Sequence, residues 1–247
     1  MTKMFGNLTQ DGLEETQDRL GGANLFDTGF YGGIIKVAYV GKASASDSRS
    51  VTVIVDVKGQ EFKETIWITT KSGDNFYPDK QDKTKKHELP GFTTINDLCL
   101  LSTGMDLASQ DTEEKVVSIY NFEQKKDIPT NVPVFPELMG KAIGLGIVRE
   151  TVDKQKKDSS GNYANTGETR DQNSIDKVFH AESGRTVAEF KAQLETPVFK
   201  AKWVEKNAGV TRNRSKGAEG NSGVPGGAKG FGSPGAASGK ATKSLFG

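Results

Sequence analysis

The sequence predicts a mainly β protein: a five-stranded Greek-key barrel with a helix after the third strand and a glycine-rich tail. Val51, Val53, Val55 and Val57 alternate along one face of a strand, and a second alternating segment follows at once. An apolar segment with helical spacing separates these strands from the later ones. Gly, Ser, Ala and Pro dominate the chain after residue 207, and this composition cannot form a packed core.

Composition limits how much of the chain packs round one core. Only 34% of the 247 residues are hydrophobic and 29 are glycine, so we expect part of the chain to be disordered. From Lys206 onward, seven Lys or Arg residues accompany one Glu, which gives this segment a charge of +6. Because the whole chain carries +1, residues 1–205 carry −5. Such a tail is expected to seek polyanions or the acidic body of its own chain.

Cysteine, histidine and hydropathy exclude several classes of protein. Cys99 is the single cysteine and lies in an apolar run, so we expect a small buried hydrophobe and no internal disulfide. With two histidines, a Cys/His zinc site is not credible. The N-terminal segment has no apolar signal core, and no span approaches 18 apolar residues. These features predict a soluble protein of the cytoplasm.

The early elements follow from alternation and turn chemistry. We expect a loose arm over 1–27, then strands over 28–42, 51–57 and 61–71, with glycines 32 and 33 allowing a bend. In the third strand, alternation places two sets of side chains on opposite faces. The inward set is Phe62, Ile66 and Ile68, and the outward set is Lys63, Thr65, Trp67, Thr69 and Lys71.

The later elements alternate with charged or proline-rich segments. A charged loop over 79–89 leads to a helix that begins at Thr93 or Thr94. A strand over 114–122, a stiff connection through prolines 129, 133 and 136, and a strand over 142–150 come next. After a second basic loop over 151–169, we expect a last strand over 173–182, a helix over 186–195 and a docked segment over 199–203.

Three early strands, a helix and further strands separated by loops follow the order of an OB-fold. This fold binds oligonucleotides on the face of its second and third strands. The position of the helix makes an immunoglobulin-like sandwich a weaker interpretation. The expected organisation is an arm (1–27), an OB-fold-like domain (28–206) and a flexible basic tail (207–247).

The expected binding face sets aromatic rings beside mobile cations. Bases stack on rings and phosphates pair with ammonium groups, so this combination is typical of single-strand binding. The other interpretation is that Trp67 packs under a loop and that the lysines only keep the loops in solution. The predicted DNA-binding residues are Lys63, Trp67, Lys71, Phe76, Tyr77, Lys80, Lys83, Lys85, Lys86, Lys154, Lys156, Lys157, Tyr163 and Arg170.

Several segments resemble the single-stranded DNA-binding proteins of tailed bacteriophages of the Schitoviridae group. They are KETIWITTKSGDNFYPDK, KHELPGFTTINDLCLL, TVDKQKKD, NSIDKVFHAESGRTV and KNAGVTRNRSKG, and the resemblance covers roughly residues 33–220. It implies an OB-type core, binding without sequence preference, and a role in phage DNA replication and recombination. It also implies that Phe76, Tyr77 and Lys80 touch DNA. Many such binders end in an acidic tail, whereas this tail is basic.

The end of the tail carries a second predicted site, for a protein partner. Lys240 and Lys243 flank Leu245 and Phe246, an apolar and basic tip suited to docking on another protein or on a neighbouring subunit. Phage replication proteins and the host RNA polymerase are the candidate partners. The alternative is a tail without a specific contact.

Two rival functions remain at this stage. In one, the protein is a phage structural or protein–protein interaction module whose aromatic face meets another protein. In the other it is an enzyme, but His87 and His180 have no Ser or Cys partner motif, and Gly144-Leu145-Gly146 lacks the third glycine of a dinucleotide loop. We therefore expect no catalytic residue, no cofactor and no metal.

Overall fold

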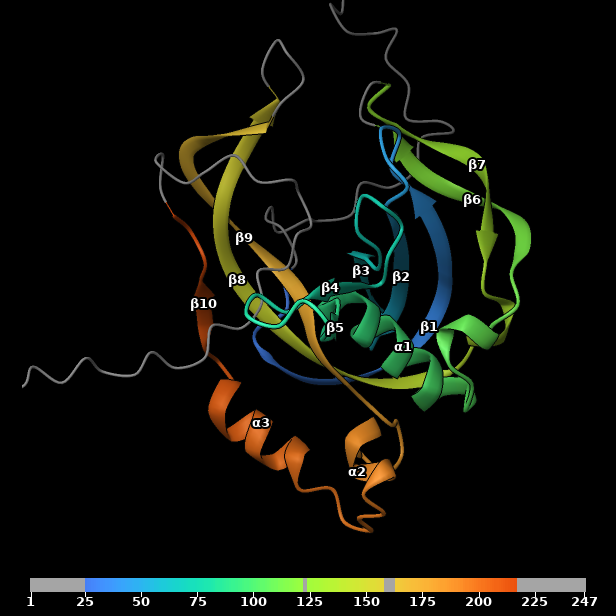
Figure 1. Ribbon diagram of the computed structural model, residues 1–247, viewed down its shortest axis with the longest axis vertical. Coiled ribbons are helices and arrows are strands. Elements are labelled where there is room, and N and C mark those ends of the chain that lie inside the picture. The colour runs from blue at the N-terminus through green and yellow to red at the C-terminus, as the bar shows by residue number, and fades with distance from the viewer. Residues whose placement is uncertain (1–24, 122–123, 158–162, 217–247) are drawn as a thin grey trace, which may run out of the picture.

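The computed structural model describes residues 25–121, 124–157 and 163–216, and it is mainly β (Figure 1). Its principal sheet has eight strands and is not closed, and a separate hairpin forms a sheet of two strands. The expected mainly β class is therefore confirmed, whereas a five-stranded Greek-key barrel is not shown, because the sheet has eight strands and is open. Within the described residues, no helix is long and apolar enough to cross a membrane.

The first three strands form an antiparallel meander: β1 (Gly29–Lys42), β2 (Arg49–Val57) and β3 (Gln60–Trp67). The valines that alternate on β2 are buried as predicted. Thr52 and Ile54, on the opposite face, are buried as well. Ile54 packs in a small cluster with Tyr39 and Val134, because a hairpin of later strands covers this side of the sheet.

Strand β3 keeps the predicted alternation but ends earlier than predicted. Phe62 and Ile66 are buried, while Lys63 is exposed. The strand stops at Trp67 rather than at residue 71, because the chain turns there: the N–H of Thr70 donates to the carbonyl of Asp74 at 2.7 Å. The short strands β4 (Phe76–Pro78) and β5 (Lys86–Glu88) follow as a hairpin, where the sequence predicted a loop.

Helix α1 (Pro90–Thr103) lies after the early strands, as predicted, but begins before Thr93. Pro90 occupies the first turn, where its missing N–H costs nothing. Gly104 ends the helix in the left-handed region at φ 79°. Cys99 is fully buried with Ile95 and Leu98, and burial raises the pKa of its thiol to about 12. The prediction of a small buried hydrophobe at Cys99 is confirmed.

Strands β6 (Glu113–Asn121) and β7 (Lys126–Val134) form a hairpin that lies over the outer face of β1 and β2 (Figure 1). The sequence predicted β6, but the expected stiff connection is wrong because β7 contains Pro129 and Pro133. Two 3-10 turns flank this hairpin, Leu107–Ser109 before it and Pro136–Leu138 after it.

The long strands β8 (Ala142–Lys157) and β9 (Tyr163–Phe179) form one extended arm. Its base belongs to the core, and its outer part runs through residues where the sequence predicted a basic loop. The expected loop over 151–169 is therefore largely strand. The start of β8 pairs with β1 from Ala142 to Ile147, so the arm is joined directly to the early strands.

The last elements wrap back onto the arm. Helix α2 (Val187–Lys191) is shorter than predicted and starts at a capping box between Thr186 and Glu189. Helix α3 (Phe199–Asn207) is anchored by Trp203, whose indole N–H donates to Asp176 at 2.6 Å. Strand β10 (Thr211–Asn213) then pairs with β8, so the sheet continues past residue 206, where the sequence placed the start of the tail.

The carboxyl group of Glu64 bridges the two edges that a closed barrel would pair. No strand pairing connects β3 to β9 within the described residues. Instead, Glu64 of β3 accepts a hydrogen bond from the N–H of Ile175 in β9 at 2.6 Å. Although the residue keeps some solvent contact, desolvation raises the pKa of its carboxyl group to about 8, and the charge of Glu150 adds to this effect.

We expect the free energy of unfolding to fall as the pH rises from the ordinary pKa of Glu64 to its raised pKa in the folded protein. The folded pKa is about 8 and the ordinary value is 4.5, so the folded state holds this proton more tightly than the unfolded state. Unfolding free energy should decrease from about pH 4.5 to about pH 8 and then level off. Glu64→Gln retains an acceptor for Ile175 without a charge, so urea titrations should show a weaker decrease and a more stable variant at pH 8. Equal slopes for both proteins would contradict this assignment.

Candidate nucleic-acid interface

Trp67 occupies the outward side of the last residue of β3 and is half-buried. Its backbone is fixed from below by the start of α1. A Cβ on Gly91 would lie 2.1 Å from the carbonyl oxygen of Trp67, so helix and strand touch here at backbone distance. The position of the tryptophan therefore depends on a contact that only glycine permits. Its ring is neither in the interior nor fully open to solvent.

The β4–β5 hairpin lies between the end of β3 and the start of α1, and it carries two further aromatic rings. It joins the end of β3 to Pro90, and the N–H of Leu89 donates to the carbonyl of Asn75 at 2.9 Å. The ammonium of Lys86 lies 4.0 Å from the centre of the half-buried Phe76 ring. On the next residue pair, the rings of Tyr77 and His87 lie 5.4 Å apart. We call Trp67, Phe76 and Tyr77 the aromatic platform.

Two aspartates hold the tip of this hairpin in shape. Asp79 accepts hydrogen bonds from the backbone N–H groups of Gln81 and Asp82 and contacts Nε2 of His87 at 2.8 Å. The N–H of Asp82, and then His87, hold the pKa of the Asp79 carboxyl down at about 2. Asp82 in turn accepts bonds from the hydroxyl and the N–H of Thr84, which lower its pKa. The charges of both aspartates are thus used inside the loop, whereas the lysines of the hairpin are exposed.

The lysines of the hairpin are exposed, but the hairpin is not strongly basic. Residues 76–88 contain four Lys and three Asp or Glu, a formal charge of +1. Lys85 contacts Asp82 at 3.6 Å. Within the described ranges, no ion pair involves the predicted residues Lys63, Lys71, Lys80, Lys83 and Lys86, all of which are exposed.

The arm of β8 and β9 carries the second group of predicted residues. Tyr163 is 41% exposed near its tip, and Lys156 and Arg170 are exposed on its strands. Lys154 is exposed too, but its ammonium contacts Glu168 at 2.9 Å. Lys157 ends β8, and its side chain lies outside the described residues. Arg149 and Thr151 bind Asp171 lower on the arm, which keeps the pKa of that carboxyl low.

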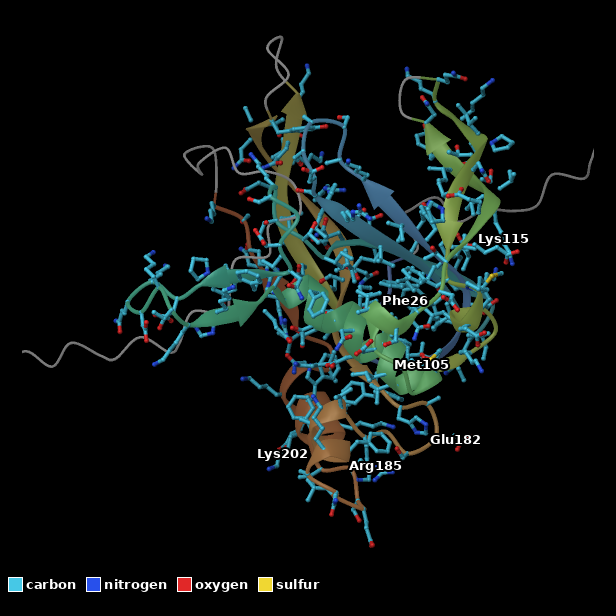
Figure 2. All side chains as sticks on the ribbon, turned by 45° about the vertical axis from the view of Figure 1, so that its right-hand side comes forward. Phe26, Met105, Lys115, Glu182, Arg185 and Lys202 are labelled. Carbon is cyan, nitrogen blue, oxygen red and sulfur yellow. The ribbon has the colours of Figure 1, made fainter. Side chains whose placement is uncertain are left out.

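The structure brings the members of each group together but separates the two groups. Figure 2 shows the β4–β5 hairpin projecting to one side while the arm of β8 and β9 rises in another direction. Trp67 ends β3 and the hairpin begins at Phe76, but Phe76 and Tyr77 are successive residues of β4, so their rings project from opposite faces of the hairpin. The hairpin and the arm therefore offer two separate surfaces rather than one continuous track. Lys240, Lys243, Leu245 and Phe246 lie outside the described residues.

Sequence reasoning missed the residues that shape the hairpin. Asp79 and His87 lie eight positions apart, and their contact brings the two ends of the loop together. The spacing of Asp79 and Asp82 is a usable signal, because an aspartate commonly binds backbone N–H groups two or three residues ahead. Charge alone places both aspartates only within a charged loop over 79–89.

A hollow of about 440 Å³ lies between α1 and α2 and is mainly apolar. His180 lies on its wall, but Nδ1 of its ring accepts a bond from the N–H of Ser183, and the ring packs edge-on against Phe190. This histidine thus holds a turn. Among the described residues there is no group of His, Cys, Asp and Glu side chains suited to a metal ion.

No protein-family model matches the chain, and a comparison with curated proteins finds no similar sequence.

Gly91→Ala should displace the base of the aromatic platform. The new Cβ cannot share space with the Trp67 carbonyl, so β3 and α1 must separate, at a cost on the order of 1–3 kcal/mol of unfolding free energy. Urea unfolding followed by tryptophan fluorescence would measure both the loss and any shift in emission. Gly32→Ala is the matched control, because nothing lies within 4 Å of its Cβ position. Equal effects of the two changes would contradict the close contact.

Proposed function

We propose that this protein binds single-stranded DNA without sequence preference, stacking bases on the aromatic platform and pairing phosphates with the neighbouring lysines. The observation that carries the proposal is the arrangement at the β3–β4 junction. Trp67 at the end of β3 and the rings of Phe76 and Tyr77, one on each face of the following hairpin, are at least partly accessible and lie on segments with exposed lysines, and the acids at the hairpin tip are bound to backbone N–H groups. Every base has a flat face, so rings of this kind select unpaired strands and tolerate any sequence.

The order of the strands supports this proposal. The path β3-β2-β1-β8 continues to β9, and α1 lies between β3 and β8 in the sequence. This is the strand order of an OB-type barrel that is open between its third and last strands, with the outer side of β3 available. Glu64 bridges the open edge. In our proposal the sheet is a modified OB-type core, and Trp67 lies on its ligand face.

The two groups of cations would serve different parts of the bound strand. Because the hairpin and the arm project in different directions, a strand stacked on the platform meets the arm only after it bends. Lys156, Tyr163 and Arg170 then form a secondary contact. The sequence resemblance to phage single-strand binders supports a role in protecting and organising such DNA during replication and recombination.

Replacing platform rings should weaken binding to a short oligothymidine. We expect Trp67→Ala and Tyr77→Ala each to lower affinity about 5- to 150-fold, which corresponds to about 1–3 kcal/mol per stacked base. Fluorescence anisotropy at fixed salt measures this change. Tyr120→Ala is the control, since this ring is similarly exposed at 43% but lies on β6. DNA should also quench Trp67, while the buried Trp203 supplies a constant background.

If the platform variants bind DNA as well as the parent protein, and DNA leaves the tryptophan emission unchanged, the proposal is wrong. The aromatic face would then be a protein-binding surface.

The lysines of the hairpin should set the dependence of binding on salt. Each phosphate contact contributes about −0.7 to the slope of log affinity against log salt for single strands. Lys80→Ala combined with Lys83→Ala should therefore reduce the magnitude of the slope by up to about 1.4. A Lys141→Ala, Lys206→Ala double variant removes the same charge from exposed sites elsewhere and should leave the slope nearly unchanged. A common slope for both double variants would show that the hairpin lysines do not meet phosphate.

A further inference from the structure

The short strands β4 and β5 direct their side chains to two different faces of the hairpin. Partners across an antiparallel ladder project to the same side, and successive residues project to opposite sides. Tyr77 pairs with His87, so these two rings share one face. Phe76 pairs with Glu88 and therefore lies on the other face. The hairpin thus presents one face with two aromatic rings and one face with a single aromatic ring.

The face of Tyr77 and His87 is the more open of the two. The side chain of His87 is 48% exposed, and Tyr77 is 41% exposed. On the other face Phe76 is half-buried, and the ammonium group of Lys86 lies 4.0 Å from the centre of its ring. One side of the Phe76 ring is therefore already occupied by a cation, whereas the paired rings remain accessible.

Tyr77 and His87 form one joint aromatic surface. Their ring centres lie 5.4 Å apart and their ring planes differ by 33°. This separation is typical of two aromatic side chains in contact. Histidine, like tyrosine, is among the side chains on which unpaired bases stack. A base that packs against Tyr77 on this face of the hairpin therefore also meets His87.

The carboxylate of Asp79 sets the orientation of the imidazole. Its Oδ2 lies 2.8 Å from Nε2 of His87. The pKa of this carboxyl group is held down at about 2, first by the N–H of Asp82, so at neutral pH the ionised group can only accept a hydrogen bond. Nε2 of His87 therefore carries the hydrogen. Oδ1 of Asp79 accepts from the N–H groups of Gln81 and Asp82, so the carboxylate is itself fixed.

The negative charge of Asp79 is compatible with a phosphate chain near this face. Hydrogen-bond donors occupy both oxygen atoms of the carboxylate. Residues 76–88 keep a formal charge of +1 with Asp79 counted as ionised. A single strand can therefore approach with its bases toward the two rings and its phosphates toward the exposed lysines of the hairpin.

We propose that His87 is a further DNA-binding residue, and that it forms with Tyr77 a two-ring surface on which a base of the bound single strand stacks. Asp79 is the positioning residue of this imidazole. The inference rests on the proposed function and deepens it, because it selects one face of the hairpin and adds a residue outside the predicted DNA-binding set. In the competing explanation, His87 only ties the end of the hairpin to Asp79.

Two substitutions at position 87 separate these explanations. His87→Phe keeps a ring beside Tyr77 but offers no hydrogen to Asp79, whereas His87→Gln offers an N–H to Asp79 but has no ring. In fluorescence anisotropy with a short oligothymidine, His87→Gln should lower affinity at least about fivefold, and His87→Phe should stay within about twofold of the parent protein. A simple tie predicts the reverse order. Near-ultraviolet circular dichroism checks the fold of both variants, whose change lies in the separate two-stranded sheet.

Photochemical crosslinking locates the contact directly. A 5-iodouracil base in the oligothymidine bonds covalently on irradiation to an aromatic side chain that lies against it, and mass spectrometry of the digested adduct identifies the residue. We expect adducts at Tyr77 and His87. Asp79→Asn removes the ionised acceptor of Nε2, so adducts at His87 should decrease relative to those at Trp67. An unchanged ratio would reject the positioning role of Asp79.

The results distinguish this inference from the function on which it rests. A parent protein that does not bind oligothymidine overturns both. If the parent binds and Trp67→Ala weakens binding, the function stands. In that case the inference is wrong if His87→Gln binds like the parent, if His87→Phe loses as much affinity as His87→Gln, or if adducts form at Phe76 and at neither Tyr77 nor His87.

Discussion

The fold depends on the place where β1 approaches β2 without a side chain between them. A Cβ on Gly33 would lie 2.6 Å from Cγ1 of Val55 and 2.7 Å from the carbonyl oxygen of Asp56. Because this contact is open only to glycine, β1 pairs with β8 along its first half and with β2 along its second half. A register shift after Ile35 accommodates the bend. One strand thus joins the two halves of the sheet, and the core forms inside the resulting curve.

The sequence predicted what local periodicity determines. The alternation of β3, the burial of the β2 valines and the position of α1 all follow from spacing along the chain. It did not predict β4 and β5, because strands of three residues exist only through contacts such as Asp79 with His87. The sequence also suggested that Pro129 and Pro133 form a stiff connection rather than part of a strand. Because they are four residues apart, both fall opposite β6 residues in pairs that exchange no hydrogen bonds, and such pairs need no N–H from the proline. The open edge of the sheet was beyond sequence reasoning, because the Glu64 contact that bridges it joins β3 to a residue of β9 that is 111 positions away.

Charge is a weaker part of the candidate site than the sequence suggested. Counting lysines along the hairpin ignores three acids in the same segment, two of which form the loop itself. A surface with a formal charge of +1 over residues 76–88 attracts phosphate at short range but does not steer DNA from far away. Stacking of bases on Trp67, Phe76 and Tyr77 would therefore supply the larger share of the proposed affinity for DNA. Ion pairs between the lysines and phosphates would supply the smaller share. This balance favours unpaired bases over duplex, whose bases cannot reach a ring.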